Sequence, residues 1–389
     1  MRILLVNHFP LEGSGSGVYT NNIAKRLLEE GHEVSVVVVD DHRVEGYPYP
    51  VRTILYPNFP CFTTHPKSNN TFYNLGREEV NDYLQRFTGV LQQAVTDFKP
   101  QLIHCQHLWV APYVALSTGV PYIITAHGTD IKGYKKDRRY HSIASRGAEK
   151  AEAIITISNE VHSQVQEYFS VPSEKLHLIL NGFDEKIFRV YDLGKKEVLR
   201  DFFPSSEVNN FKEQRIVSFV GKLTDFKGVD LLIRAAADYE RRLPGTITLI
   251  TGDGELRDEL QSLADRVGAE GVYFLGNQPQ QQVARINNIA DLAVFPSRGE
   301  PFGLVALEAL ACGTPVITSD SGGFPDFINN RVGALFNSDD HQDLCDKIIE
   351  GLEKDYKEEK GEYAVKYANN NFSWSRVIDE VLEVYLKIL

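Results

Sequence analysis

Residues 290–320 read ADLAVFPSRGEPFGLVALEALACGTPVITSD, and this stretch decides the fold. Its first eight residues are a short apolar run that ends at a turn, which predicts a buried strand. Its last twelve residues predict the end of a helix, a Gly-Thr-Pro turn and another buried strand. Glu300 is therefore expected in the loop at the carboxyl end of a parallel strand, and Glu308 about two turns into the next helix. In open α/β sheets, ligands bind at that edge.

The two carboxylates have two possible explanations. Glu300 and Glu308 are suited to accept hydrogen bonds from sugar or ribose hydroxyls, and hydrogen bonds to an ionised acceptor are the stronger kind. Acids near the start of a helix are also favoured by the helix dipole and then simply remain solvated. Taken alone, the pair favours the second explanation, because charged side chains are mostly exposed.

Length and composition limit the classes of protein to be considered. A chain of 389 residues predicts two domains, and 42% hydrophobic with 24% charged residues is typical of a globular protein. The sequence has no run of about 18 apolar residues that would predict a transmembrane helix. The N-terminal MRILLVNHF leads directly into a strand and does not resemble a signal peptide. The net charge of -12 disfavours general nucleic-acid binding.

The cysteines predict neither a metal site nor a disulfide framework. Cys61, Cys105, Cys312 and Cys345 are scattered without CxxC spacing. Such usage fits a reducing cytosol, so we expect a cytoplasmic protein. The sequence also contains no HExxH motif and no evident Ser-His-Asp arrangement.

Apolar strands alternate with amphipathic helices in two series along the chain. Short runs rich in β-branched residues predict strands that are buried on both faces, as in parallel sheets. The first series is expected at residues 3–6, 34–39, 102–104, 122–125, 153–157 and 176–180. The second series is expected at residues 216–220, 246–251, 272–275, 292–295, 316–318 and 334–336. Residues 183–214 are expected to form a linker and a surface helix.

Three loops that follow predicted strands carry residues suited to ligands. The first is Gly13-Ser14-Gly15-Ser16-Gly17, which is either a phosphate-binding loop at a helix start or a flexible turn. The second carries Lys222 and Lys227, which either neutralise a diphosphate or are ordinary exposed lysines. The third carries His127, which either contacts a ligand or is a structural histidine.

A basic cluster lies just after His127. Lys132, Lys135, Lys136, Arg138 and Arg139 fall within eight residues. Up to residue 182 the chain has 17 Lys and Arg against 18 Asp and Glu, so the remainder carries nearly all of the negative net charge. The cluster is either a solvated helix face or a contact for an anionic acceptor or an anionic membrane surface.

Taken together, these motifs resemble family 4 of the retaining glycosyltransferases, which have the GT-B fold. The resemblance covers nearly the whole chain, and the motifs come in the family's order. They are the glycine loop ending at Gly17, Gly31-His32-Glu33-Val34, His127-Gly128, Asn181-Gly182-Phe183-Asp184, residues 221–228, residues 300–308, Ser319-Asp320-Ser321-Gly322-Gly323 and Phe372-Ser373-Trp374. Residues 300–308 and 311–315 are among the most specific parts. The combination favours a functional role for Glu300 and Glu308.

The resemblance implies an α/β fold with two facing Rossmann-like domains, parallel sheets and a deep interdomain cleft. Residues 1–183 are expected to form the acceptor-side domain. Residues 184–371 are expected to form the domain that binds the nucleotide sugar. After an Asn-rich turn, a helix at about residues 372–389 is expected to return to the first domain.

The resemblance also implies roles for individual residues in a retaining glycosyltransferase that uses a nucleotide diphosphate sugar. The catalytic candidates are His127, Lys222, Lys227 and Glu300. The candidates for binding the sugar donor are Gly15, Ser16, Gly17, Phe302, Gly303, Leu304 and Glu308. The acceptor-side candidates are Asp130, Lys135, Lys136, Arg138 and Arg139. Glu308 would bind the ribose and Glu300 the sugar hydroxyls, while Lys222 and Lys227 would stabilise the leaving diphosphate. No metal or other cofactor is expected.

Two positions depart from the family pattern. Lys222 stands where the family commonly has Arg, which keeps the charge but loses the two-pronged contact of a guanidinium with phosphate. Ser16-Gly17 stands where the family has a pair of glycines, so the loop still consists of small residues. Neither departure is expected to abolish activity, but each is expected to tune affinity for the sugar donor.

Substrates and alternative functions remain open at this level. UDP-hexose and UDP-N-acetylhexosamine are the commonest sugar donors among similar enzymes. The acceptor is a glycan, a lipid-linked molecule or a small molecule, and residues 57–74 are expected to shape its pocket. Contact with the inner face of a membrane is compatible with the basic cluster. The alternatives are a GT-B sugar-nucleotide epimerase and a non-catalytic subunit that binds a sugar nucleotide.

Overall fold

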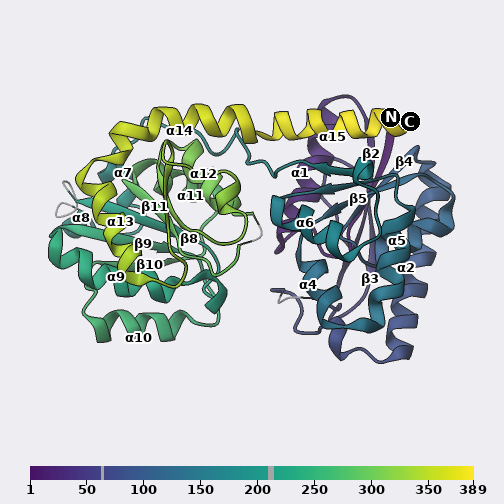
Figure 1. Ribbon diagram of the computed structural model, residues 1–389, viewed down its shortest axis with the longest axis horizontal. Helices are drawn as coiled ribbons and strands as arrows, with labels where there is room; N and C mark the ends of the chain where they lie inside the picture. Colours follow the sequence, from purple (N-terminus) through teal and green to yellow (C-terminus); the bar gives the residue numbers. More distant parts are fainter. Residues whose placement is uncertain (63–64, 209–213, 301) are drawn as a thin grey trace. The chain divides into compact units, whose positions relative to one another are not determined.

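The computed structural model describes residues 1–62, 65–208, 214–300 and 302–389, and the chain divides into two compact units. The first unit comprises Met1–Asn181 and Val377–Leu389, and the second comprises Gly182–Arg376. Each unit contains one parallel sheet flanked by helices (Figure 1). Among the described residues, no helix is both long enough and apolar enough to span a bilayer.

The first unit is built on a seven-stranded parallel sheet in the order β3-β2-β1-β4-β5-β6-β7. Its central strands are buried apolar runs, as both-face burial requires. The strands are β1 (Arg2–Val6), β2 (Glu33–Asp40), β3 (Val51–Leu55), β4 (Leu102–Gln106), β5 (Tyr122–Ala126), β6 (Ala153–Thr156) and β7 (Leu176–Leu178). The helices are α1 (Gly15–Glu29), α2 (Arg77–Phe98), α3 (Val110–Ala115), α4 (Thr129–Lys136), α5 (His141–Lys150) and α6 (Asn159–Tyr168).

Strand β3 was not predicted from the sequence. It is the outermost strand of its sheet and pairs only with β2 among the described strands. Most of its residues are half-exposed or exposed, and Arg52 forms an ion pair with Asp97 of α2. An edge strand of this kind lacks the continuous apolar run by which the central strands were recognised.

The second unit is built on a six-stranded parallel sheet in the order β10-β9-β8-β11-β12-β13. The strands are β8 (Arg215–Val220), β9 (Thr246–Thr251), β10 (Val272–Gly276), β11 (Leu292–Phe295), β12 (Val316–Ser319) and β13 (Gly333–Phe336). The helices are α7 (Lys195–Leu199), α8 (Ser205–Val208), α9 (Val229–Arg242), α10 (Arg257–Val267), α11 (Gln280–Ile289), α12 (Leu304–Ala311), α13 (His341–Glu353) and α14 (Tyr356–Phe372). Helix α15 (Trp374–Ile388) begins in this unit, and from Val377 onward it belongs to the first unit. Helix α9 packs against α10 and α13, whereas α12 packs against α11 and α14.

The segment expected to be a linker with a surface helix also contributes to the core. Helices α7 and α8 bury Val198, Leu199 and Val208 in one apolar cluster with Ile216 and Leu249 of the sheet. These few apolar residues lie among charged ones, so the sequence did not indicate that they would be buried. The expected surface helix is therefore present as the short helices α7 and α8, and what the sequence did not predict is that each buries one side in the core.

The end of the chain also differs from expectation. Residues 369–371 lie in α14 and do not form a turn. Asn369 and Asn371 each donate a side-chain hydrogen bond to the backbone carbonyl four residues earlier, at Val365 and Tyr367. Helix α15 follows at once, and its Tyr385 hydroxyl is 2.7 Å from Nδ1 of His104 in β4. The helix therefore packs its C-terminal part into the first unit, as expected.

Candidate functional site

Most residues predicted to bind the sugar donor lie at the carboxyl edge of the second sheet. Strands β8 and β11 are neighbours in that sheet, so the loops after them meet. The first loop carries Lys222, which is exposed, and Lys227, and the second loop carries Glu300. Nζ of Lys227 donates a hydrogen bond to Oε2 of Glu300, and the two side chains are 22% and 15% exposed. The fold thus joins Lys227 and Glu300 in one largely buried ion pair.

Arg298 supports this arrangement and was not singled out in the sequence. Its backbone N–H donates to the carbonyl of Phe226, beside Lys227. Its guanidinium donates to the carboxylates of Asp230 at 2.8 Å and Asp339 at 2.7 Å, and it also contacts Asp225. Hydrogen bonds to Asp230 and Asp339, together with these nearby charges, raise the pKa of Arg298. Arg298 therefore fixes the lysine loop to the Glu300 loop.

The start of α12 lies directly after Glu300. Phe302 is buried, Gly303 is the N-cap residue and Leu304 is the first helical residue. Gly303 has φ +97, and a Cβ atom there would lie 2.2 Å from Cε1 of Phe324. Only glycine fits this backbone, and the first N–H groups of a helix lack partners within the helix. Such groups bind anions. Pro301 lies outside the described residues.

Glu308 lies in the second turn of α12, closer to the helix start than expected. It is the fifth residue of the helix, which is one turn and not two beyond Leu304. Burial and, secondarily, the charge of Asp184 raise the pKa of Glu308 to about 7. A carboxyl group with this pKa changes charge near neutral pH. Asp184, known in the sequence only as part of a motif, is thus an electrostatic neighbour of Glu308.

The glycine loop of the first unit forms the N-terminus of α1. Ser14 is the N-cap residue, and its hydroxyl accepts a hydrogen bond from the N–H of Gly17. A Cβ atom at Gly17 would lie 2.2 Å from the carbonyl oxygen of Pro10, whereas one at Gly15 would have no neighbour within 4 Å. Ser16 is buried. Close packing against Pro10 is therefore sufficient to explain the glycine at position 17. Binding of a sugar donor by Gly15, Ser16 and Gly17 stays a prediction.

His127 lies at the carboxyl end of β5 and is 8% exposed. Its Nε2 is 2.8 Å from Oε1 of Gln106, the last residue of β4. Because the amide oxygen can only accept, Nε2 of His127 carries the proton. Burial, and then the neighbouring His107, lower the pKa of His127 well below its usual value. Gln106 fixes the tautomer and the orientation of this ring, and no local sequence pattern indicated that pairing.

The predicted acceptor-side residues separate into two groups. Asp130 is buried, and its Oδ2 accepts a hydrogen bond from the N–H of Leu108 at 2.7 Å. Arg139 donates hydrogen bonds to the backbone carbonyls of Leu75 and Tyr73. These two side chains hold the fold together. In contrast, Lys135, Lys136 and Arg138 are exposed, as is Lys132 of the same basic cluster.

Among the described residues, one group of side chains has a spacing suited to a metal ion. It consists of Asp40, the last residue of β2, and of Asp41 and His42 directly after it. Nζ of Lys67 donates to both carboxylate oxygens of Asp40, at 3.1 and 3.4 Å. The ammonium of Lys67 therefore already neutralises Asp40, the buried residue of the three. None of the three is a predicted site residue.

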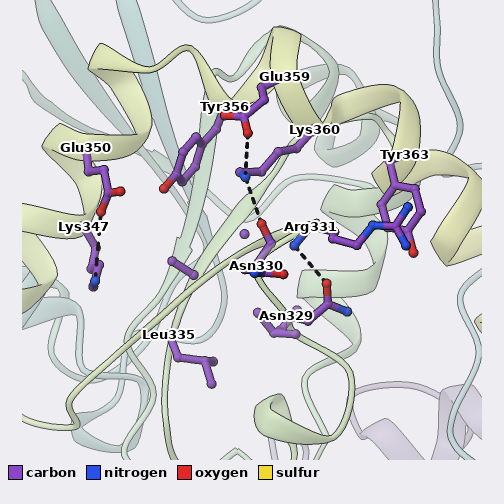
Figure 2. Close-up of a pocket in the computed structure, with 13 residues that line it drawn as sticks. Asn329, Asn330, Arg331, Leu335, Lys347, Glu350, Tyr356, Glu359, Lys360 and Tyr363 are labelled. Atoms are coloured by element: carbon purple, nitrogen blue, oxygen red, sulfur yellow. Dashed lines mark hydrogen bonds and ion pairs between the residues drawn. The ribbon is translucent and has the colours of Figure 1, made fainter.

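A pocket of about 810 Å³ lies elsewhere in the second unit, between β13, α13 and α14. Figure 2 shows Lys360 bonded to Asn330 and Glu359 on its wall, with Arg331 lying against Tyr363. Residues 328–331, which precede β13, form part of its lining. None of the predicted site residues lines this pocket. Ligands of parallel sheets bind at the carboxyl ends of strands. This pocket is therefore not the predicted site.

Two family models match the chain, one in each half. Residues 13–186 match the model described as Glycosyltransferase Family 4, and residues 202–371 match the model described as Glycosyl transferases group 1. A D-inositol 3-phosphate glycosyltransferase from Mycobacteroides abscessus is 31% identical over 81% of this chain and 72% of its own length. An uncharacterized glycosyltransferase from Methanocaldococcus jannaschii is 28% identical over 95% of this chain and 94% of its own.

Solved structures share the architecture. A sucrose-phosphate synthase from Thermosynechococcus elongatus superposes with a TM-score of 0.80 at 20% identity, covering 100% of this chain and 99% of that one. The Anabaena protein HepE, solved with UDP and glucose, superposes with a TM-score of 0.77 at 20% identity over 100% of both chains. At these identities the likeness shows the fold. With the family matches, it establishes that the chain is a glycosyltransferase of family 4 with the GT-B fold.

Proposed function

We propose that the protein is a retaining, metal-independent glycosyltransferase that moves a sugar from a UDP-hexose or UDP-N-acetylhexosamine to an acceptor hydroxyl. The observation that carries this proposal is the contact between Lys227 and Glu300 directly before the N-terminus of α12. A lysine and a helix N-terminus favour phosphate groups, and a carboxylate favours hydroxyl groups. The combination suits a diphosphate that is joined to a sugar.

The proposed chemistry depends on charge that develops as the diphosphate leaves. Negative charge grows on the phosphates while the sugar becomes oxocarbenium-like. Lys222, Lys227 and the N–H groups of residues 302–304 stabilise this charge, and loss of one such group typically lowers the rate by about two to three orders of magnitude. The lysines supply the positive charge for which other enzymes use a divalent ion.

We assign the remaining contacts by the chemistry of each side chain. On binding of the sugar donor, Glu300 exchanges the Lys227 ammonium for sugar hydroxyls. Glu308 accepts hydrogen bonds from the ribose, and His127 lies near the donor sugar. The bond from the anomeric carbon to the phosphate oxygen breaks while a bond to the acceptor oxygen forms on the same face. The acceptor proton passes to a phosphate oxygen of the leaving group, so no enzymatic nucleophile is needed.

The comparisons support the class of sugar donor without identifying it. HepE, which has the same fold, was solved with UDP and glucose and also with UDP-glucose. The relatives that are named for their reactions act on different acceptors, since they include D-inositol 3-phosphate glycosyltransferases and a glycogen synthase. A UDP-sugar is therefore the first donor to test, and the acceptor requires a panel.

The exposed basic residues of α4 and its C-terminal loop support a contact with an anionic surface. Lys135 and Lys136 lie over the rings of Tyr168 and Tyr73, at 4.4 and 4.2 Å from the ring centroids. Arg138 is exposed beside them. We propose that this face of the first unit approaches the inner surface of a membrane when the acceptor is lipid-linked. Co-sedimentation with liposomes that contain or lack anionic lipid tests this point.

A thermal-shift screen of nucleotide sugars is the primary experiment. A ligand at 100 times its Kd stabilises its protein by about 2.7 kcal/mol. We expect UDP-sugars to give the largest shift, and transfer by the responsive pair to persist in excess chelator with retention of the anomeric configuration. Conversion of the sugar nucleotide to an epimer without acceptor would instead identify an epimerase. Saturable binding without turnover on any acceptor would identify a binding subunit.

A further inference from the structure

The pocket of about 810 Å³ in the second unit has no role in the proposed function, because none of the residues assigned to the sugar donor lines it. Its walls are residues 328–331, side chains of α13 and α14, and β13, the outermost strand of the second sheet. Sites for small molecules commonly have volumes of about 300–1,000 Å³. The pocket is therefore large enough for a ligand of its own.

The side chains of α14 that line the pocket include three on one face of the helix. Tyr356, Lys360 and Tyr363 follow one another at spacings of four and three residues (Figure 2). Nζ of Lys360 lies 4.3 Å from the ring centroid of Tyr356, and the guanidinium carbon of Arg331 lies 3.6 Å from that of Tyr363. Each tyrosine ring thus holds a cation at the wall of the pocket.

Arg331 is the cation best placed to bind an anionic ligand. It is exposed, and its side chain forms no ion pair among the described residues. A guanidinium that stacks on a ring keeps its N–H groups in its own plane, where they can bind a phosphate or carboxylate through two parallel hydrogen bonds. Lys360, in contrast, already donates to the carbonyl of Asn330 at 2.8 Å and to Glu359 at 3.2 Å.

The charge of the lining favours a ligand with one anionic group. The cations Arg331, Lys347 and Lys360 exceed the carboxylates of Glu350 and Glu359 by one. Two carboxylates in the lining would repel a polyanion. Glu359 is 55% exposed, and a carboxylate has about four acceptor sites, so this side chain can also accept hydrogen bonds from hydroxyl groups.

The uncharged part of the lining suits a sugar ring. Asn329 and Asn330 are exposed, and their amide groups can donate to hydroxyl groups and accept from them. Ile328, Ala334 and Leu335 add apolar surface. A sugar that carries a single phosphate or carboxylate group matches both the charged and the uncharged parts of this pocket.

One segment joins the pocket to the Glu300 loop within the second unit. The N–H of Gly323 donates to the carbonyl of Glu300 at 2.8 Å. Four residues later, the ring of Phe327 lies 5.1 Å from the ring of Phe302, measured between centroids. The pocket lining begins at the next residue. The segment therefore contacts the Glu300 loop at one end and the pocket at the other.

We propose that this pocket binds a sugar ring that carries one anionic group, and that its occupancy strengthens binding of the nucleotide sugar at the Glu300 loop. A ligand that fixes residues 329–331 orders the segment that packs on this loop, so less freedom is lost when the second ligand binds. The second half of the inference rests on the proposed function, because it takes the ligand of the Glu300 loop to be a nucleotide sugar.

Calorimetric titration tests the first half without any turnover. Glucose 6-phosphate and D-glucuronate are the charged sugars, and they distinguish a phosphate from a carboxylate. D-Glucose and inorganic phosphate each carry only one of the two features. We expect at least one charged sugar to bind at least tenfold more tightly than either control, because a charged hydrogen bond and the ring contacts act together. An affinity matched by either control would overturn the inference.

Three variants locate the bound sugar. Arg331→Gln should weaken binding of the charged sugar at least tenfold, and Glu359→Gln at least threefold. Lys366→Gln is the matched control, because Lys366 is an exposed lysine of α14 outside the pocket that pairs with Glu362. It removes one positive charge and should leave the affinity unchanged. Equal weakening by Arg331→Gln and Lys366→Gln would show a general charge effect and overturn the site.

The Lys227→Ala variant separates the pocket from the candidate site for the sugar donor. A phosphate or carboxylate that binds beside Glu300 loses its lysine in this variant, whereas a ligand of the pocket does not. We expect the charged sugar to bind Lys227→Ala with unchanged affinity. Binding that is lost in Lys227→Ala and retained in Arg331→Gln would place the sugar at the donor site and overturn the inference.

The second half is tested by the Kd of UDP-glucose with and without a saturating amount of the charged sugar. We expect at least threefold tighter binding in the wild type and no change in Arg331→Gln. By linkage, UDP-glucose must tighten binding of the charged sugar by the same factor. An unchanged or raised Kd in the wild type would overturn the link while the site and the proposed function stand. If no UDP-sugar binds, the proposed function and the link both fail, and the titration still decides the site.

Discussion

The Lys227 ammonium is hydrogen-bonded to the Glu300 carboxylate across 73 residues of sequence, so the two groups neutralise each other at the edge of the second sheet. A ligand that binds Lys227 through a phosphate must separate this pair. Under the proposed function, a nucleotide sugar would replace both partners, because its phosphate would take the lysine and its hydroxyls would take the carboxylate. A nucleotide without a sugar replaces only one of them.

The Lys227→Ala variant tests the lysine. We expect kcat/KM for transfer to fall at least tenfold, because the charge on the leaving diphosphate loses one preorganised partner. Lys227→Arg is the matched control and should retain more activity, since it keeps the charge. Steady-state kinetics together with thermal melting would check this, and an unchanged kcat/KM in a folded Lys227→Ala protein would remove the lysine from the mechanism.

The Glu300→Gln variant tests the competition within the pair. It releases Lys227 from its carboxylate partner, so we expect UDP alone to bind several-fold more tightly. Transfer should fall about tenfold or more, because the sugar hydroxyls lose a charged acceptor. Calorimetric titration with UDP and with UDP-glucose measures both effects. Equal weakening of the two ligands would contradict the proposed exchange of partners.

The buried carboxyl of Glu308 predicts a pH dependence of nucleotide-sugar binding. Its pKa is raised to about 7, so it is largely protonated at pH 6 and largely ionised at pH 8. Under the proposed function it is the ionised form that accepts the ribose hydroxyls, so the Kd of UDP-glucose should fall about tenfold between these pH values. UDP-glucose is preferable to UDP, whose terminal phosphate titrates near pH 6. Glu308→Gln should give a flat profile; a tenfold change that persists in it would locate the titration elsewhere.

The sequence predicted the central strands well because each is a buried, β-branched run, and such runs have few alternatives. The prediction failed for elements that bury only one side or only a few residues. Strand β3 is an exposed edge strand, and the buried part of α7 is only Val198 and Leu199 between charged residues. Residues 369–371 resemble a turn in composition, yet their amide groups bond to the preceding helical turn.

The part of the site that could be predicted from the sequence is the part that follows from the rule for parallel sheets, in which ligands bind at the carboxyl ends of the strands. That rule places Glu300 and Lys227 each at the end of a strand, but not beside each other, because local patterns do not encode the strand order β8-β11. The same limit explains why Arg298 was missed, since its partners Asp230 and Asp339 are 68 and 41 residues away. Partners so far apart leave no local signal.

Two glycines of one helix provide a matched test of packing at the glycine loop. Gly17→Ala places a Cβ atom 2.2 Å from the carbonyl oxygen of Pro10, and this backbone atom can move away only if the main chain shifts. The Cβ atom of Gly15→Ala has no neighbour within 4 Å. We expect Gly17→Ala to destabilise the protein by about 1–3 kcal/mol or more. Gly15→Ala should be neutral or slightly stabilising. Chemical unfolding measures both, and equal stability of the two variants would contradict the close approach at Gly17.

Four buried histidines make the first unit sensitive to acid. Burial lowers the pKa of His104 and of His107 to about 3, and it lowers the pKa of His8 and of His127 well below the usual 6.5. In the unfolded chain these groups take up protons near pH 6.5. The unfolded state therefore binds more protons below that pH, and the free energy of unfolding falls as the pH falls. Between pH 7 and pH 5.5 the loss is about 1 kcal/mol for each histidine.

The sign and size of this effect can be measured on the first unit alone. Urea unfolding followed by Trp109 fluorescence in a Trp374→Phe background reports on this unit, because Trp109 belongs to it and Trp374 to the second. His8→Phe breaks no hydrogen bond among the described residues and should remove one histidine's share of the pH dependence, about 1 kcal/mol. A stability that rises on acidification from pH 7 to pH 5.5 would show that the buried imidazoles are protonated in the folded protein.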